Sequence, residues 1–524
     1  MVDIDKKICY HIFWQDFEYF RDLGDFMPNK SKQLPRGAGI LLPVSSLPSP
    51  YGIGTLGKAA FTFLDFLKAA RQKYWQVLPV GPTSFGDSPY QSFSAFAGNP
   101  YFIDLDTLCE EGLLQEEEIK GFDWGKAPED VDYAKLYQSR FQVLRLAFQR
   151  SKHIGTPAYE AFCEEQALWL EDYALYMALK DSFHGQEWLL WPERIRMRDA
   201  EEVEIWSALL EEERNFWKFC QFQFYQQWDR VRDYAKACGV QIIGDIPIYV
   251  ALDSADVWVH GELFQLDAQH RPTCVAGVPP DAFSETGQLW GNPLYDWEEM
   301  EQTDFAWWKA RMAHSARLYD VIRIDHFIGT VRYYAIPYGA ETAARGEWRQ
   351  GPGIKLVKAI DSAVGTSKII AEDLGALVPE VRKVLKQAGY PSMKVMQFGF
   401  DSDAQNEHLP HNYSQNMAIY GGTHDNETLV GHYVEKKGKD ARYAMRYLQV
   451  HRRKDIPKAM IVAGYASVAN TVLYQIQDLL FLPNSARMNF PSTLGGNWRW
   501  RLVEGQLTDE LADWLCELAE TYGR

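Results

Sequence analysis

The sequence has few cysteines for its length, and they are scattered along the chain. Its 524 residues contain seven cysteines and no Cys-x-x-Cys spacing. An odd, scattered set argues against both a disulfide framework and a structural zinc site. It is typical of a cytoplasmic enzyme whose thiols stay reduced, and we therefore expect a cytoplasmic protein.

Long apolar segments are also missing. No window approaches the roughly 18 uninterrupted apolar residues of a membrane span. The first residues, MVDIDKKICYHIFWQDFEYF, lack the apolar stretch of roughly 7–15 residues that a secretion signal needs. We expect neither a membrane-spanning helix nor a secretion signal.

Positive charge is in short supply. Lys and Arg number 54 against 71 Asp and Glu, a formal net charge of −17. A non-specific nucleic-acid binder needs a basic surface, and an anionic membrane would repel this chain, so we expect neither as a partner. The hydrophobic fraction of 46% is instead enough to form a large folded core.

What the sequence does contain is a series of short apolar runs followed by Gly, Asp, Asn or Pro, which is typical of buried parallel strands. Several precede helical patterns, for example at 58–70 and 378–389. Repeated strand–helix units predict right-handed parallel connections. The predicted strands are residues 38–44, 74–80, 240–250, 319–325, 367–373, 393–400, 416–422 and 471–480.

Two α/β architectures repeat strand and helix in this way. A doubly wound open sheet usually has a Gly-rich phosphate turn directly after its first strand. The only match, GIGTLG at 52–57, lies well beyond the first strand and behind prolines. The eight strands fit a (β/α)₈ TIM barrel, which takes roughly 250 residues plus insertions, and we favour that fold.

The spacing of the strands predicts insertions in a barrel of residues 36–524. Residues 84–238 are rich in aromatics at helical spacing and predict a helical inserted subdomain. Residues 251–318, dense in Gly, Pro and Trp, predict a loop-rich insertion at the active-site rim. Within it, 275–297 is either a lid over the site or an ordered loop packed on the barrel. Residues 1–35 are expected to be an N-terminal extension.

Acidic residues end three of the predicted strands. Asp325 ends VIRID, Glu372 follows KIIA, and Asp425 lies in GGTHDNET. Because catalytic groups of a barrel gather at the carboxyl ends of its strands, these acids should meet at one mouth. Paired carboxylates of this kind predict glycoside chemistry, in which one attacks and the other serves as acid and then base.

The local sequence indicates different roles for these acids. Arg323 and Asp325 lie two apart on one strand and share a face, so the guanidinium favours the charged carboxylate that a nucleophile needs. Apolar neighbours should raise the pKa of Glu372, which suits a proton donor. Asp373 points to the opposite face and is expected to be structural, as a cap of the next helix. His424 beside Asp425 suits contacts with sugar hydroxyls.

Each acid has a simpler interpretation, because a lone Asp at a strand end is more often a helix cap. A Mg²⁺ site is the competing functional interpretation, since it also gathers carboxylates. It fits less well because Arg323 and His424 add positive charge beside the cation. We expect no metal and no cofactor.

Longer blocks of the sequence carry more information than these single residues. They are RGAGILLPVSSLPSPYGIGTLG, YWQVLPVGPTSFGDSPYQSFSAFAGNPYFIDL, GVPPDAFSETGQLWGNPLYDW, RIDHFIG, IIAEDLG, GGTHDNET and ARMNFPSTLGGNW. From about residue 36 to the C-terminus, the chain closely resembles the amylomaltase family of 4-α-glucanotransferases, or disproportionating enzymes. The resemblance implies an α-amylase-like barrel with inserted subdomains and no obligatory metal.

The resemblance also implies roles at matching positions. Asp325 would be the nucleophile, Glu372 the general acid/base, and Asp425 the third acid, which grips substrate hydroxyls and stabilises the transition state. The family often has Tyr before GDSPY where this chain has Phe85, which removes a hydroxyl from a remote glucan site. The implied substrate-binding residues are Arg323, His424, Tyr90, Trp290, Asp281, Asp401 and Asn489.

The implied reaction is retaining disproportionation, with malto-oligosaccharides or other α-1,4-glucans as donor and acceptor. The carboxyl groups of Asp325 and Glu372 should then lie about 5–5.5 Å apart. Two alternatives stay open: an α-1,4-glucan hydrolase that uses water as the acceptor, and a non-catalytic glucan-binding protein on the same barrel. The sequence gives no indication of an oligomeric state.

Overall fold

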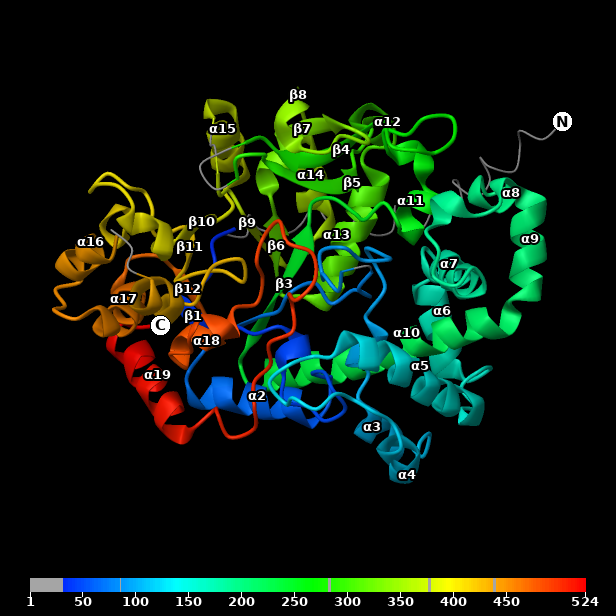
Figure 1. The fold of residues 1–524 in the computed structure, drawn as a ribbon, viewed down its shortest axis with the longest axis horizontal. Coiled ribbons are helices and arrows are strands. Elements are labelled where there is room, and N and C mark those ends of the chain that lie inside the picture. Colours follow the sequence, from blue (N-terminus) through cyan, green and yellow to red (C-terminus); the bar gives the residue numbers. More distant parts are fainter. Residues whose placement is uncertain (1–31, 85, 281–283, 376–377, 437–439) are drawn as a thin grey trace.

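The computed structural model describes residues 32–84, 86–280, 284–375, 378–436 and 440–524. At its centre the predicted (β/α)₈ barrel is confirmed (Figure 1). All neighbouring strands of the barrel are parallel, in the order β1-β12-β11-β10-β9-β6-β3-β2. The strands are β1 (Gly37–Leu41), β2 (Tyr74–Gln76), β3 (Gln241–Pro247), β6 (Val321–Asp325), β9 (Lys368–Ala371), β10 (Ser392–Val395), β11 (Met417–Tyr420) and β12 (Thr471–Gln475).

Every predicted strand is present, but most end earlier than predicted. Strand β2 ends at Gln76, a 3₁₀-helix (Met396–Phe400) follows β10, and the short helix α18 (Ile476–Leu479) follows β12. The residues beyond these strands, such as Val77 and Leu479, are still buried. The apolar runs therefore marked burial correctly, whereas strand pairing stops where the chain turns away from its neighbour.

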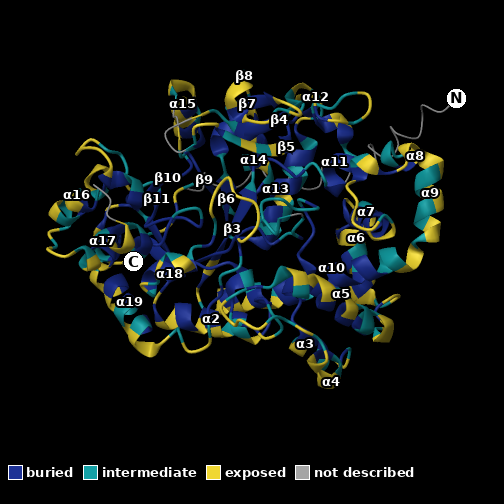
Figure 2. Cartoon of the chain, in the orientation of Figure 1, coloured by how far each residue is buried: buried dark blue, intermediate teal, exposed yellow. Residues whose placement is uncertain are grey.

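Helices surround the barrel, and each of them has buried apolar residues. Figure 2 shows buried strands at the centre and exposed residues on the outer sides of the helices. None of the described helices combines the length and the apolarity that crossing a bilayer requires. The surrounding helices are α2 (Lys58–Ala69), α13 (Ala306–Leu318), α14 (Ile354–Ala363), α15 (Pro379–Ala388), α16 (Asp440–Tyr447), α17 (Ile456–Ala466) and α19 (Asp509–Thr521).

A helical set lies between β2 and β3, within the predicted insertion. Its longest helix, α10 (Glu211–Ala237), runs back to the barrel and contacts both α7 and α2. Two buried glutamines of α10 bond the backbone of the segment after β2. Gln221 accepts from the N–H of Gly98 (2.7 Å) and donates to its carbonyl (2.9 Å). Gln227 accepts from the N–H of Asp104 (2.6 Å). That this set is a separate domain stays a prediction. The other helices are α3 (Leu105–Glu110), α4 (Glu116–Lys120), α5 (Tyr133–Arg150), α6 (Pro157–Glu165), α7 (Leu170–Ser182), α8 (Glu193–Arg196) and α9 (Ala200–Leu209).

A second sheet, which was not predicted from the sequence, lies beside the barrel. It is antiparallel, in the order β5-β4-β7-β8. Two of its strands precede β6 in the sequence and two follow it. The stretch predicted to be loop-rich thus contains two strands. The period-two pattern was not evident there because Gly277 lies in β4 and Gly291 and Pro293 lie in β5. The elements are β4 (Cys274–Val278), β5 (Gln288–Pro293), β7 (Arg332–Pro337) and β8 (Glu347–Gln350), with the helices α11 (Ala255–Val259) and α12 (Trp297–Gln302) nearby in sequence.

A glycine of β3 is required by close packing, and this can be tested. A Cβ atom on Gly244 would lie 2.2 Å from the ring of the buried Tyr319. We expect Gly244→Ala to lower the free energy of unfolding by about 1–3 kcal/mol, the usual cost of overpacking, measured by denaturant unfolding. Gly121→Ala is the matched control, because a Cβ there meets nothing within 4 Å. Equal stability of the two variants would contradict this packing.

Candidate active site

Three acidic side chains lie at the carboxyl ends of barrel strands. Asp325 is the last residue of β6, Glu372 directly follows β9, and Asp425 lies in the loop after β11. In the register of β6 and β9, Ile324 pairs with Ala371, so the next residues, Asp325 and Glu372, lie side by side. The alignment continues past the strand, since the N–H of Glu372 donates to the carbonyl of Ile324 (3.1 Å).

Arg323 forms a buried ion-pair network beneath Asp325. Its Nη1 contacts both carboxylate oxygens of Asp245 at 2.6 and 2.7 Å, and its Nη2 lies 2.9 Å from Asp325 Oδ1. The parallel register of β3 and β6 pairs Asp245 directly with Arg323. Although burial lowers the pKa of Arg323, the two carboxylates raise it above its usual value, so the guanidinium stays charged.

Asp245 is a member of the site that sequence reasoning missed. A signal was present, because this residue is the one acid in the otherwise apolar run VQIIGDIPIYV. A buried charge requires a partner, so an acid in a core strand predicts an ion pair at its level in the sheet. The sequence alone did not indicate which basic residue lies on the neighbouring strand.

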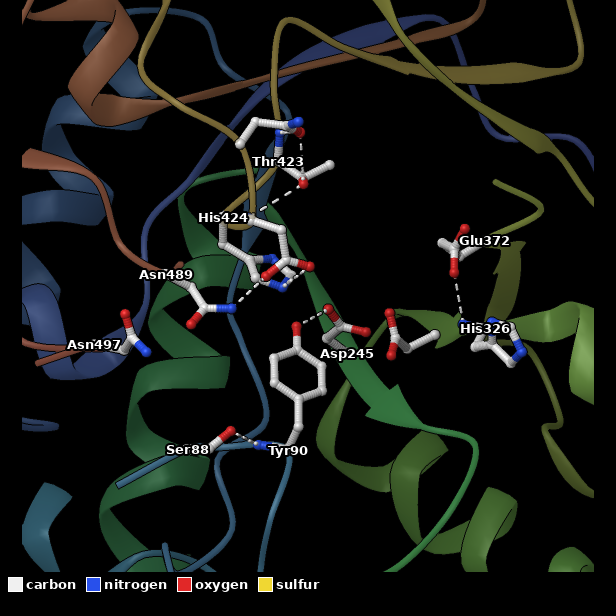
Figure 3. A network of polar contacts seen from close by, with 12 residues as sticks. Ser88, Tyr90, Asp245, His326, Glu372, Thr423, His424, Asn489 and Asn497 are labelled. Carbon is white, nitrogen blue, oxygen red and sulfur yellow. Dashed lines mark hydrogen bonds and ion pairs between the residues drawn. The ribbon is translucent and has the colours of Figure 1, made fainter. Parts of the chain in front are cut away.

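Glu372 is buried, and two backbone N–H groups hold its carboxyl group. His326 N–H donates to Oε2 (2.7 Å) (Figure 3). Leu374 N–H donates to Oε1 (2.6 Å). These bonds favour the carboxylate, as does Arg323, but burial and then the negative charge of Asp325 oppose them more strongly and raise the pKa of Glu372 to about 8. The expected raised pKa is thereby supported, and Glu372 holds a proton at neutral pH.

Asp425 is more exposed and is held from the other side of the site. Its Oδ1 accepts from Asn489 Nδ2 (2.6 Å), and its Oδ2 lies 3.5 Å from His424 Nε2. The ring of Tyr90 stacks on that of His424, with centroids 5.2 Å apart and planes 22° from parallel. Asn489, Asp425, His424 and Tyr90 thus contact one another in series and form one wall of the site.

Tyr90 connects this wall to the ion-pair network. Its hydroxyl donates to Asp245 Oδ2 (2.9 Å) (Figure 3). Burial raises the pKa of Tyr90 well above 10, and the charges of Asp245, Asp325 and Asp425 raise it further. The ring of Tyr90 therefore lies near Asp245, Asp325 and Asp425, and the register of β6 and β9 places Glu372 beside Asp325. Figure 3 shows Tyr90 and His424 on one side of the view and Glu372 and His326 on the other.

The remaining predicted residues divide into three groups. Trp290 of β5 packs edge-on against the ring of His326 (4.8 Å, 85°), so it lies beside the loop that holds Glu372. Asp401 lies on an exposed loop, where its carboxylate accepts from Asn406 (3.0 Å), and no contact joins it to the three acids within the described structure. Asp281 and Phe85 lie outside the described residues.

Asp373 is structural, but it is not the predicted helix cap. Its carboxylate accepts from Ser392 Oγ (2.6 Å) and the N–H of Met393 (2.8 Å), which joins the end of β9 to β10. The next helix, α15, begins at Pro379 and has Val378 at its N-cap position. The prediction of a cap was wrong because an acid at a strand end can bond the neighbouring strand instead of the next helix.

The donor set does not favour a bound cation. Among the described residues, no three His, Cys, Asp or Glu side chains are arranged to hold a metal ion. The carboxylates of Asp245 and Asp325 already face a guanidinium, which occupies the place where a cation would bind. A carboxylate paired with a guanidinium, next to a carboxyl group with a raised pKa, is an arrangement suited to nucleophilic attack and proton transfer.

A closed (β/α)₈ barrel with acids at the ends of its strands defines an enzyme of the barrel class. Comparison with known proteins specifies which one. A family model described as 4-alpha-glucanotransferase matches residues 42–507, and the chain belongs to this family of glucan-transferring enzymes.

Similar proteins support this assignment over nearly the whole chain. The 4-alpha-glucanotransferase of Clostridium butyricum is 46% identical over 483 residues, covering 92% of this chain and 99% of the relative. That of Thermus thermophilus is 46% identical over 503 residues, covering 94% and 100%. The solved structure of amylomaltase from Streptococcus agalactiae in complex with acarbose has a TM-score of 0.90 and 40% identity, covering 93% of this chain and 99% of that one.

The raised pKa of Glu372 predicts a pH-dependent stability. Its folded-state pKa is raised from 4.5 to about 8, so the folded protein holds a proton that the unfolded chain releases. This contribution to stability is fully present below pH 4.5 and is lost as the pH rises to and through about 8. Urea unfolding of the wild type and of Glu372→Gln should therefore show the wild type losing stability relative to the variant up to about pH 8. A pH-independent difference would contradict the raised pKa.

Proposed function

We propose that the enzyme transfers α-1,4-glucan segments by a retaining mechanism, with Asp325 as the nucleophile and Glu372 as the general acid/base. The observation that carries this proposal is the contrast between two adjacent carboxyl groups. Asp325 is paired with a guanidinium, whereas the buried carboxyl group of Glu372 is bonded, within the described residues, by two backbone N–H groups and no basic side chain. Carboxyl groups in environments that differ in this way take on separate roles as base or nucleophile and as acid.

In the first half-reaction, an Asp325 oxygen attacks the anomeric carbon of the donor sugar. The bond from that carbon to the glycosidic oxygen breaks, and the proton of Glu372 passes to the departing oxygen. In the second half-reaction, the ionised Glu372 accepts the proton of a 4-hydroxyl on the acceptor glucan. The acceptor oxygen then displaces Asp325 and restores the α-linkage, and the enzyme returns to its starting state.

The other residues of the site would bind the sugar. Asp425 and His424 present a carboxylate and a ring nitrogen suited to adjacent hydroxyls, and Tyr90 and Trp290 offer aromatic rings for stacking. Asn489 holds Asp425, and Arg323 holds Asp325, so their support of binding is indirect. Asp281 and Asp401 stay weaker proposals, made on the family resemblance alone.

The proposal extends to location and domain organisation. We propose that the enzyme works in the cytoplasm, which agrees with free thiols at the six described cysteines. The helical insertion and the stretch containing β4 and β5 are proposed to flank the site and favour a sugar over water as the acceptor. Positioning a sugar hydroxyl and excluding solvent are the means by which transfer exceeds hydrolysis.

Incubation with maltotriose alone tests the reaction class. Transfer to a second maltotriose yields glucose together with longer oligosaccharides, whereas hydrolysis yields maltose and glucose without elongation. We expect elongation, measured by chromatography of the products with a glucose assay, and we expect it to persist in a metal chelator. Products no longer than maltotriose would favour the hydrolase alternative.

Removal of the proton donor should slow the reaction strongly. We expect Glu372→Gln to reduce kcat/KM by about 10²–10⁴-fold, the usual contribution of general acid–base catalysis. In the wild type, kcat/KM should decrease as the pH rises through about 8, where Glu372 loses its proton. Asp373→Asn is the matched control, because Asp373 is the neighbour of Glu372 and its carboxylate bonds only β10 in the described structure. The kcat of this variant should stay near that of the wild type.

A further inference from the structure

Asp425 is held by the segment that contains Arg487 and Asn489. Arg487 Nη2 donates to the backbone carbonyl of Asp425 (2.6 Å), and Arg487 Nε donates to the carbonyl of Asn489 (2.7 Å). Asn489 Nδ2 in turn donates to Asp425 Oδ1 (2.6 Å). The three residues therefore form a closed ring of hydrogen bonds, which fixes both the backbone and the carboxylate of Asp425.

The segment that carries Arg487 is itself attached along the loop after β11. Buried Asp478 of α18 accepts from the N–H of Leu429 (2.7 Å), and Asn484 donates to Glu427 (3.2 Å). A Cβ atom on Gly431 would lie 2.6 Å from Asn484 Cβ, so the two segments are in close contact there. These contacts pin the loop at several successive positions.

Glu427 shows that this arrangement has a supporting rather than a substrate-binding role. Its carboxylate lies 2.6 Å from Lys436 Nζ and 3.1 Å from His432 Nδ1, and it also accepts from Asn484. The acid two residues beyond Asp425 is thus fully engaged in holding the loop. Asp425 differs because, among the described residues, its Oδ2 lies beside His424 alone and its side chain is 46% exposed, which leaves that oxygen accessible to a ligand.

Arg487 is suited to this bridging by its shape. A guanidinium offers several N–H groups in a fixed plane, so it can bond two carbonyls at once, whereas an ammonium group is a single point of charge. The guanidinium also lies over the ring of Phe490 (4.3 Å), which restricts its rotation. Burial lowers the pKa of Arg487, opposed by the carboxylates of Glu427 and Asp425.

We propose that Arg487 is a positioning residue for catalysis: it acts through Asp425, which it holds in the orientation that binds the sugar in the transition state. This proposal rests on the proposed function of Asp425. Because a displacement of about 1 Å in an active site can cost about 100-fold in rate, loss of the ring should reduce kcat even though Arg487 itself does not touch the substrate.

A double-mutant cycle on maltotriose disproportionation tests the proposal. We expect Arg487→Ala to reduce kcat by about 10–100-fold with little change in KM. In the Asp425→Asn background, the same substitution should reduce kcat by less than about twofold, because residues that act through one another are not additive. Arg487→Lys, which keeps the charge but bonds one carbonyl at most, should recover only part of the loss, and it serves as the readout if the alanine variant does not fold.

Arg36→Ala is the matched control for a purely structural arginine. Arg36 donates to the carbonyls of Ala469, Ser467 and Tyr522 near the amino ends of β1 and β12, at the opposite end of the barrel. We expect this variant to lower the melting temperature with kcat unchanged. If Arg487→Ala behaves in the same way, the positioning role is wrong.

The two proposals fail in different ways. Losses from Arg487→Ala and Asp425→Asn that multiply in the double variant would overturn the positioning role and leave the function of Asp425 intact. An Asp425→Asn variant with unchanged kcat would overturn the role of Asp425 itself, and the positioning role with it. A reduced kcat in both single variants, Asp425→Asn and Arg487→Ala, with no further loss in the double variant supports both proposals.

Discussion

The ion pair of Arg323 with Asp245 and Asp325 is the interaction on which the rest of the site depends. Taking a charge out of water costs several kcal/mol unless a partner compensates it. Here one guanidinium compensates two carboxylates from adjacent strands, β3 and β6. Without it, the acids at this mouth would repel one another and bind protons. With it, the carboxylate of Asp325 has an opposite charge 2.9 Å away, next to a Glu372 whose pKa burial raises to about 8.

Glu372 shows how competing effects settle a protonation state. Two backbone N–H groups favour its carboxylate, but burial and the charge of Asp325 outweigh them. One of these N–H groups belongs to His326, a non-glycine residue with a φ of 50°. Such a left-handed conformation is costly and persists only where surrounding contacts impose it. The turn after β6 thus aims a backbone donor at the acid of the neighbouring strand, and the two residues are fixed together.

Support for Asp425 is of another kind, because it lies in a loop and not on a strand. Strand residues such as Arg323 and Asp245 are placed by sheet register, which leaves little freedom. The loop after β11 has no such register and is instead bonded by side chains from the segment after β12. The same mouth of the barrel therefore combines acids held by the sheet with an acid held by hydrogen bonds between loops.

The sequence by itself determined the eight strands, the acids at their ends and the shared face of Arg323 and Asp325, because burial and the period of a strand are local properties. It did not determine which residues lie opposite one another. Asp245 as the partner of Arg323, Asp373 bonding β10 and the ring around Asp425 follow from register and from loops that meet far apart in sequence. The second sheet was missed for the same reason, because its strands come from before and after β6 in the sequence. Glycine in β4, and glycine and proline in β5, also obscure the pattern of a strand. Tertiary structure decided these features because a hydrogen bond between distant segments leaves no periodic trace in either one.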